Sequence, residues 1–124
     1  MKILVVDDEQ MILDLVVRIL EKGNHKAITV DSGKNSISIF EQNKENIDIV
    51  ILDHNMPDIS GIEVLKAIRK IEPDIPCLYS SGEVNIKKKI PEELKINTYF
   101  LVKPYQALSM LDLVTQISHK KIKK

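Results

Sequence analysis

The stretch Ile51–Pro57, "ILDHNMP", places an aspartate directly after a run of strongly apolar residues. The run begins earlier, as "IDIVIL" (Ile47–Leu52), and it is short and rich in β-branched side chains, which is typical of a β-strand. Because the run lacks strict alternation of apolar and polar residues, we expect both faces of the strand to be covered, as in a parallel sheet. Asp53 then stands at the end of a buried strand, where an ionised carboxylate is costly unless it has a partner.

Four further segments are predicted strands, and helical patterns lie between them. The strands cover Lys2–Val6, Lys26–Val30, Pro76–Ser80 and Thr98–Val102. The helices cover 9–23, 35–43, 60–71 and 105–118, and Ser60 is a candidate cap for the third of them. Pro91 rules out a long helix between 82 and 97, so we expect a short or irregular element there.

Residues at helical spacing predict one stripe on each of three helices. These stripes are Ile12, Leu15, Val16, Ile19 and Leu20; Ile62, Leu65, Ile68 and Arg69; and Leu108, Leu111 and Val114 or Thr115. Strand and helix alternate along the whole chain, which favours an α/β fold with helices on both faces of a parallel sheet. Right-handed crossovers then give a doubly wound three-layer sandwich, and the length suits one domain over 1–124.

Composition excludes several classes of protein. Lys plus Arg and Asp plus Glu number 18 each, so bulk charge gives no reason to expect nucleic-acid binding or attraction to a membrane surface. No apolar stretch approaches the roughly 20 residues that span a bilayer, and "MKILVVDDEQ" reads as a strand rather than a signal peptide. We therefore expect a soluble cytoplasmic protein with Cys77 as a small core residue, a natural start at Met1 and a frayed basic end, "HKKIKK", over 119–124.

Polar side chains recur where the predicted strands end. Asp7 and Asp8 end the first strand, Asp53 ends the third, Ser81 follows the fourth, and Lys103 ends the fifth. Each of them alone could be a helix cap, a loop acid or a solvated lysine. In an open α/β sheet, however, ligands bind outside the carboxyl ends of the strands. The repetition at four strand ends therefore predicts one functional site at that edge.

The charges at this edge predict the chemistry of the site. Two carboxylates about 4 Å apart repel by roughly 4 kcal/mol at an effective dielectric near 20, so positive charge is needed among them. Lys103 supplies one charge, and a divalent cation with hard oxygen ligands, Mg²⁺ or Mn²⁺, would supply two more. Carboxylates, a lysine and a hydroxyl around a metal suit phosphoryl transfer, with a carboxylate as a possible nucleophile.

These residues lie in motifs that closely resemble the receiver domain of two-component response regulators. The matching stretches are "ILVVDDE", "VILDHNMPDISGIEVLKAIR", "IPCLYSSG" and "YFLVKPY". The resemblance covers nearly the whole chain and implies a flavodoxin-like sheet of order 2-1-3-4-5, with an irregular fourth helix here. It also implies that the chain is a phosphoacceptor rather than an enzyme. The partners would be a sensor histidine kinase or a histidine phosphotransfer protein and a downstream target that the sequence does not name.

The resemblance assigns a metal ligand set. Asp53 matches the phosphoacceptor, and it also matches a direct ligand of the metal together with Asp8 and the main-chain carbonyl of Asn55. Asp7 matches an acid that acts mainly through water.

The resemblance also assigns the residues of a switch. Ser81 and Lys103 match the hydroxyl and the lysine that contact the phosphoryl group, and the Lys103–Pro104 bond is a candidate cis peptide. Phe100 matches the aromatic switch position, with plain core packing as the alternative. His54 should point to the face of the sheet opposite Asp53, because side chains alternate along a strand, so it is a neighbour of the site rather than a catalyst.

The sequence departs from the family pattern at three places. Gly82 stands where an alanine is usual, "LKIN" replaces a usual Gly-Ala before the last strand, and Pro91 interrupts the fourth helix. Two other functions stay open at this stage. One is a receiver-like interaction module that takes no phosphate, and the other is an aspartate-nucleophile phosphohydrolase of the haloacid dehalogenase type. The hydrolase would need an acid where this chain has Asn55.

Overall fold

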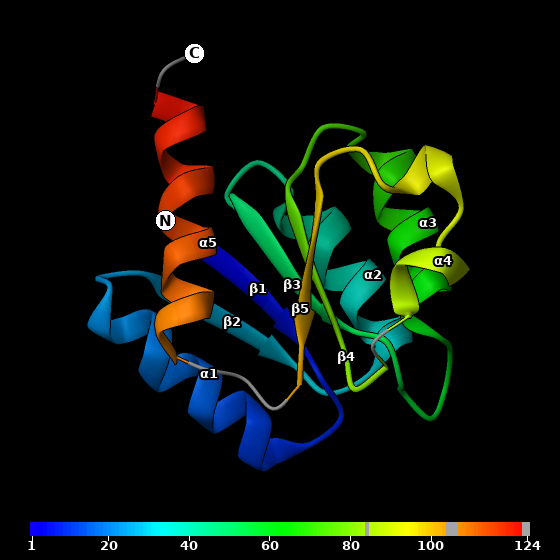
Figure 1. Cartoon of the computed structure of the whole chain (residues 1–124), viewed down its shortest axis with the longest axis horizontal. Helices are drawn as coiled ribbons and strands as arrows, with labels where there is room; N and C mark the ends of the chain where they lie inside the picture. Colours follow the sequence, from blue (N-terminus) through cyan, green and yellow to red (C-terminus); the bar gives the residue numbers. More distant parts are fainter. Residues whose placement is uncertain (84, 104–106, 123–124) are drawn as a thin grey trace.

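A five-stranded parallel sheet forms the centre of the protein, with strand order β2-β1-β3-β4-β5 (Figure 1). The computed structural model describes residues 1–83, 85–103 and 107–122. The strands are β1 (Lys2–Val6), β2 (Lys26–Val30), β3 (Ile49–Asp53), β4 (Cys77–Ser81) and β5 (Thr98–Val102). All four pairings are parallel, which confirms the predicted fold class and strand order.

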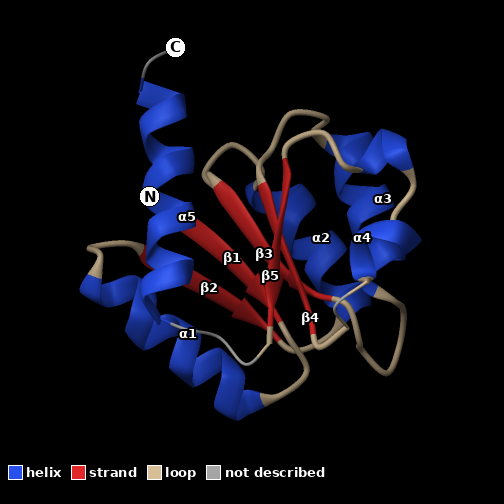
Figure 2. Ribbon diagram, in the orientation of Figure 1, coloured by secondary structure: helices blue, strands red, loops and turns tan. Residues whose placement is uncertain are grey.

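Helices cover both faces of this sheet. One face carries α1 (Gln10–Lys22) and α5 (Ala107–Ile122), as Figure 2 shows. The other face carries α2 (Gly33–Asn43), α3 (Gly61–Ile71), the single turn α4 (Ile86–Lys89) and the 3₁₀ turn η1 (Glu92–Leu94). The result is the three-layer sandwich that the alternation of strands and helices predicted.

The pleat of β3 divides the core into two layers. Ile49 and Ile51 belong to the layer under α1 and α5, which also contains Leu78 and Met110. Val50 and Leu52 belong to the layer under α2 and α3, which also contains Tyr79. Every residue of β3 is buried, so the run of apolar residues did reflect a strand covered on both faces.

The predicted stripes of two helices differ in part from the buried residues, although Val16, Ile19 and Leu20 of α1 are buried as predicted. In α1 the buried residues include Leu13, whereas Leu15 is 42% exposed. In α5 the buried stripe is Met110, Val114 and Ile117, and Leu108 is 77% exposed, so the predicted stripe was wrong except for Val114 and the partly buried Leu111. Several neighbouring positions of each helix are apolar, and the docking angle on the sheet selects which of them face inward.

The helix ends follow local chemistry. Ser60 caps α3 as predicted, because its hydroxyl accepts the Glu63 N–H. Ser32 caps α2 in the same way, accepting the Asn35 N–H at 3.1 Å, so that helix begins at Gly33 rather than at the predicted residue 35. Ser32 is thus a helix start signal that the prediction missed.

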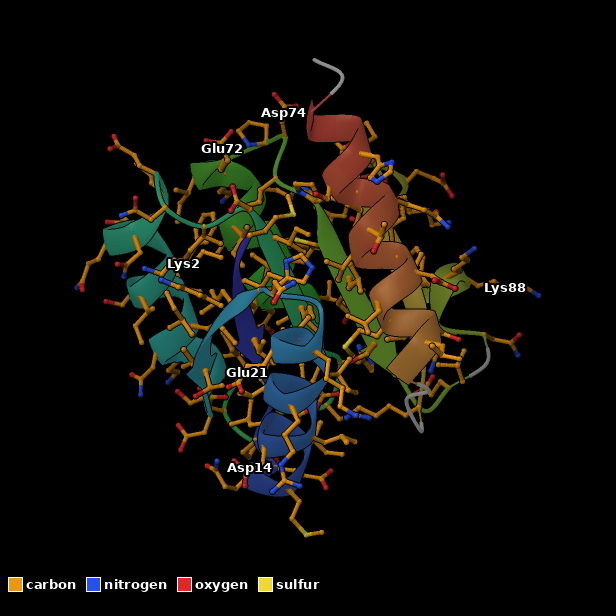
Figure 3. The ribbon with its side chains drawn as sticks, turned by 90° about the vertical axis from the view of Figure 1, so that its left-hand side faces the viewer. Lys2, Asp14, Glu21, Glu72, Asp74 and Lys88 are labelled. Carbon is orange, nitrogen blue, oxygen red and sulfur yellow. The ribbon has the colours of Figure 1, made fainter. Side chains whose placement is uncertain are left out.

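The segment between β4 and β5 is irregular, as Pro91 predicted. It contains the turn α4 and the turn η1, and Pro91 is the residue that precedes η1. All three lysines of α4 are exposed, and Figure 3 shows Lys88 projecting away from the body of the molecule.

The basic end is helical for longer than expected. α5 continues to Ile122, into the segment 119–124 that was predicted to fray. Ile117, in the turn before that segment, is buried in the core and holds this part of the helix on the sheet.

Cys77 is fully buried, and desolvation raises the pKa of its thiol to about 11, as expected of a core residue. Within the described ranges, none of the helices is both long and apolar enough to cross a bilayer.

Candidate functional site

The carboxyl ends of β1, β3 and β5 bring three carboxylates and a lysine together. Oxygens of Asp7, Asp8 and Asp53 all lie within 4.8 Å of one another. The Lys103 Nζ lies 2.9 Å from Asp53 Oδ1 and 3.2 Å from Asp7 Oδ2. The sequence predicted this convergence from strand ends alone, and the geometry confirms it for these four residues.

Strand register explains why these residues meet. Val6 of β1 pairs with Leu52 of β3, so Asp7, the residue after β1, lies level with Asp53, the last residue of β3. Ser81 of β4 pairs with Val102 of β5, so Lys103 leaves the sheet one step later and its long side chain reaches back across. Parallel strands align their carboxyl ends at one edge, which is where ligands bind in this class of fold.

Two of the three carboxylates are buried. Asp7 is 1% exposed and Asp53 is 3% exposed, whereas Asp8 is exposed to solvent. Burial raises the pKa of the Asp53 carboxyl, and the charge of Asp7 raises it further. The hydrogen bond and charge of Lys103, with the Asn55 N–H, act in the opposite direction. Asp7 Oδ1 also accepts the Glu9 N–H at 3.0 Å, so both of its oxygens are engaged.

Ser81 is the last residue of β4 rather than the residue after the strand. It is 1% exposed, and its hydroxyl accepts the Glu83 N–H at 3.0 Å. A Cβ at Gly82 would meet no atom within 4 Å, so this glycine leaves open space where the family usually has an alanine. The hydroxyl therefore sits at the predicted edge of the sheet, next to an exposed glycine.

The comparison with known proteins settles the family. The family model of the response regulator receiver domain matches residues 3–115. The chain belongs to this family. It is 38% identical over 81 residues to the response regulator SaeR of Staphylococcus aureus (strain USA300), a match that covers 65% of this chain and 34% of SaeR. The matched segment is thus about a third of that relative.

Solved receiver structures share the fold over nearly the whole chain. A response regulator receiver domain protein from Clostridium thermocellum is 31% identical with a TM-score of 0.86, and the match covers 99% of this chain and 98% of that one. TrrA of Thermotoga maritima, solved in complex with Mg²⁺ and BeF, is 28% identical with a TM-score of 0.82. That match covers 94% of this receiver and 97% of TrrA.

A cleft opens beside the acidic residues of the receiver. It has a volume of about 510 Å³ and is lined by Asp8, Asn55, Asp58 and their neighbours in the loop that follows β3. Asn55 is exposed, and its backbone N–H bonds to the Asp53 carboxylate. Asn55 therefore lies next to Asp53 and lines the same cleft as Asp8, and its role as a metal ligand stays a prediction.

His54 lies on the face of the sheet opposite Asp53, as strand alternation predicted. Its Nδ1 is 2.5 Å from the Tyr79 hydroxyl oxygen, and the two ring centroids are 5.7 Å apart. The Tyr79 ring lies 6.1 Å from that of Phe100, over which the Lys87 Nζ sits at 5.3 Å. A continuous row of rings thus joins His54, the residue after Asp53, to Phe100.

Tyr79 is the member of this row that sequence reasoning missed. It is fully buried, and desolvation, with the charges of Asp53 and Glu83, raises the pKa of its phenol. Only its β-strand position suggested core packing, and nothing in the sequence pointed to His54 as the partner of its hydroxyl. Phe100 is half-buried against the same core layer, which fits both interpretations of that residue.

Asp58 is the second residue that sequence reasoning missed. Its carboxylate accepts the N–H groups of Gly33 and Lys34 at the start of α2. In the sequence, an acid after a proline indicates only a loop. The N–H groups that Asp58 binds lie about 25 residues earlier, so no local pattern links them to it. The candidate cis peptide Lys103–Pro104 lies outside the described residues and stays a prediction.

Proposed function

We propose that this receiver takes a phosphoryl group onto Asp53 in a Mg²⁺-dependent reaction and thereby switches the surface around β4 and β5. The observation that carries the proposal is the position of Lys103, whose ammonium bonds both buried acids, Asp7 and Asp53. The ammonium of Lys103 lowers the pKa of the Asp53 carboxyl against the raising effect of burial, and so favours the ionised form that a nucleophile requires.

The donor set fits a hard divalent cation. Asp7, Asp8 and Asp53 offer carboxylate oxygens within one small volume, and Asn55 lines the adjoining cleft, where its main-chain carbonyl could add a further oxygen ligand. We assign Asp8, Asp53 and the Asn55 carbonyl as direct ligands and Asp7 as a ligand through water. When bound, the cation, Mg²⁺ or Mn²⁺, neutralises charge on the oxygens of the phosphoryl group.

The chemical step uses the Asp53 carboxylate as the nucleophile. Its oxygen attacks the phosphorus of a phosphohistidine on a sensor kinase or phosphotransfer protein, a P–O bond forms and the P–N bond breaks. The electron pair of that bond stays on the leaving imidazole nitrogen, which takes a proton from solvent. Lys103, already 2.9 Å from Asp53 Oδ1, then pairs with a phosphoryl oxygen. Water later hydrolyses the acyl phosphate, so the chain acts on itself and not as an enzyme on a separate substrate.

The switch follows from the bond that Ser81 makes before phosphorylation. Its hydroxyl now accepts the Glu83 N–H, and turning it toward a phosphoryl oxygen releases that N–H and frees the loop after β4. Phe100, in the adjacent strand, can then repack. To move a population from 1:99 to 99:1, the phosphoryl group must favour the active state by about 5.5 kcal/mol.

The test is an intact-mass measurement after incubation with acetyl phosphate, with and without Mg²⁺, on the native chain and on Asp53→Asn. We expect one added phosphoryl group that needs both Mg²⁺ and Asp53. An unchanged mass, with no response to beryllofluoride, would instead indicate an interaction module. Loss of acetyl phosphate without an adduct calls for a phosphomonoester assay, in which turnover would identify a hydrolase. The proposed cellular setting is the cytoplasm, where a kinase could supply the phosphoryl group.

A further inference from the structure

Asp58 connects the loop after β3 to a helix that lies 25 residues earlier in the chain. Its Oδ1 accepts the Gly33 N–H at 3.1 Å, and its Oδ2 accepts the Lys34 N–H at 2.8 Å. These are the first two residues of α2, whose N–H groups have no acceptor within the helix. The amide donors of Lys34 and Gly33 hold the pKa of this carboxyl below its usual range. The side chain is therefore a charged cap supplied from another element.

The loop and α2 are in direct contact at this point. A Cβ on Gly33 would lie 2.6 Å from Ile59 Cγ1 and 3.1 Å from Val64 Cγ2, so only a glycine leaves the required space. Ile59 packs against the core layer under α2 and α3. The polar bonds of Asp58 and the apolar contact of Ile59 therefore fasten the same part of the loop.

The ends of this loop are fixed separately. The His54 N–H donates to the Ser80 carbonyl at 2.9 Å, and the Gly61 N–H donates to the His54 carbonyl at 2.9 Å. The bonds of Asp58 hold the middle of the loop, three residues beyond Asn55, and Asp58 lines the same cleft as Asn55 and Asp8. A displacement of Asp58 would thus be transmitted to Asn55, because only a short loop segment separates the two residues and both ends of the loop are held by hydrogen bonds.

We propose that Asp58 is a positioning residue for the metal site: its bonds to the start of α2 hold the loop so that the Asn55 carbonyl faces Asp8 and Asp53. This inference rests on the proposed function, since it assumes that Asn55 is a ligand of the metal. Asp58 itself is not part of the group of described carboxylates that could share a metal, which consists of Asp7, Asp8 and Asp53.

The chain offers a matched control in Ser32. This residue caps the same helix, accepting the Asn35 N–H, but it belongs to the segment before α2 and not to the loop. Ser32→Ala therefore removes a cap of α2 and leaves the link between α2 and the loop intact. Asp58→Ala removes that link, and Asp58→Asn keeps one acceptor oxygen and loses the charge.

The experiment is a Mg²⁺ titration of the native chain and the three variants, followed by ¹H–¹⁵N NMR. The spectra also report whether each variant is folded and whether the Gly33 and Lys34 amides have lost their acceptor. We expect Asp58→Ala to weaken Mg²⁺ binding about tenfold, the lower end of the loss that follows removal of an outer partner in a metal site. Asp58→Asn should be intermediate, and Ser32→Ala should change the affinity less than twofold.

Phosphorylation by acetyl phosphate gives a second readout. The rate of the Asp58→Ala chain should fall at low Mg²⁺ and return to the native rate at saturating Mg²⁺, because a misplaced ligand weakens binding without removing the nucleophile. Native affinity in Asp58→Ala, or an equal loss in Ser32→Ala, would overturn the inference while the native chain still binds Mg²⁺ and is phosphorylated. A native chain that binds no Mg²⁺ would overturn the proposed function, and the inference would fall with it.

Discussion

Replacing Lys103 with methionine should destabilise the metal-free receiver, since it leaves two buried carboxylates without their cation. Lys103 bonds Asp53 and Asp7, and both acids are almost fully buried. Methionine keeps most of the length of the side chain, so the change removes charge with little change in packing. The perturbation therefore isolates the electrostatic contribution of the lysine.

The magnitude follows from the distances at the site. At an effective dielectric near 20, separations of 2.9 and 3.2 Å correspond to attractions of about 6 and about 5 kcal/mol. The two acids, with oxygens within 4.8 Å, repel by about 3.5 kcal/mol or more. The net loss on removing the lysine is much smaller than these Coulomb energies, because the ammonium is hydrated in the unfolded chain and one of the two acids can take up a proton in the variant. Removing one partner of a buried ion pair typically costs about 3–5 kcal/mol, and because Lys103 is 21% exposed we expect about 3 kcal/mol.

The assay is urea unfolding at pH 7 in a chelator, followed by circular dichroism. Lys66→Met, at an exposed lysine of α3, is the control and should change the free energy of unfolding by less than about 0.5 kcal/mol. Saturating Mg²⁺ should reduce the difference in free energy of unfolding between the native chain and Lys103→Met, because the folded variant binds the cation without competition from the lysine.

Two results would refute the reasoning about Lys103. One is a decrease in the free energy of unfolding of less than about 1 kcal/mol for Lys103→Met, which would mean that the ion pairs of Lys103 contribute no more than ordinary surface ion pairs. The other is an effect of Lys103→Met that is just as large in an Asp53→Asn background, because Asp53→Asn removes one of the two buried charges that the lysine compensates.

Three other predictions concern the residues around this site. Burial raises the pKa of Asp53, so the ionised form of Asp53 destabilises the folded protein at neutral pH. In the absence of metal, Asp53→Asn should therefore raise the Tm at pH 7. This increase in Tm should become smaller as the pH falls through the raised pKa, because the native Asp53 is then protonated as well. Gly61→Ala should lower the free energy of unfolding by about 1–3 kcal/mol in the same urea assay, because its Cβ would overlap the Asp53 carbonyl and lie 2.8 Å from the Tyr79 hydroxyl. Gly82→Ala is the control: its Cβ would enter open space, so the free energy of unfolding should change by under about 0.5 kcal/mol. Tyr79→Phe should cost about 1 kcal/mol in that assay by removing the bond to His54, and no loss would show that the bond contributes nothing.

Much of the fold was predictable because its signals are local. The buried strand before Asp53, the cap at Ser60 and the irregular segment around Pro91 each follow from the residues themselves. The inward-facing residues of α1 and α5 were less predictable, since Leu13 and Leu15 are equally apolar and only docking on the sheet separates them.

The sequence by itself determined which residues form the acidic site, because parallel strands necessarily bring their carboxyl ends to one edge. Asp7, Asp53 and Lys103 follow strands that could be recognised one at a time, and their meeting needed no further information. Only the tertiary structure decided the bonds of Asp58 to α2 and of His54 to Tyr79. Each of these bonds joins elements about 25 residues apart, and a hydrogen bond forms only when packing brings donor and acceptor within about 3 Å, a precision that no local pattern encodes.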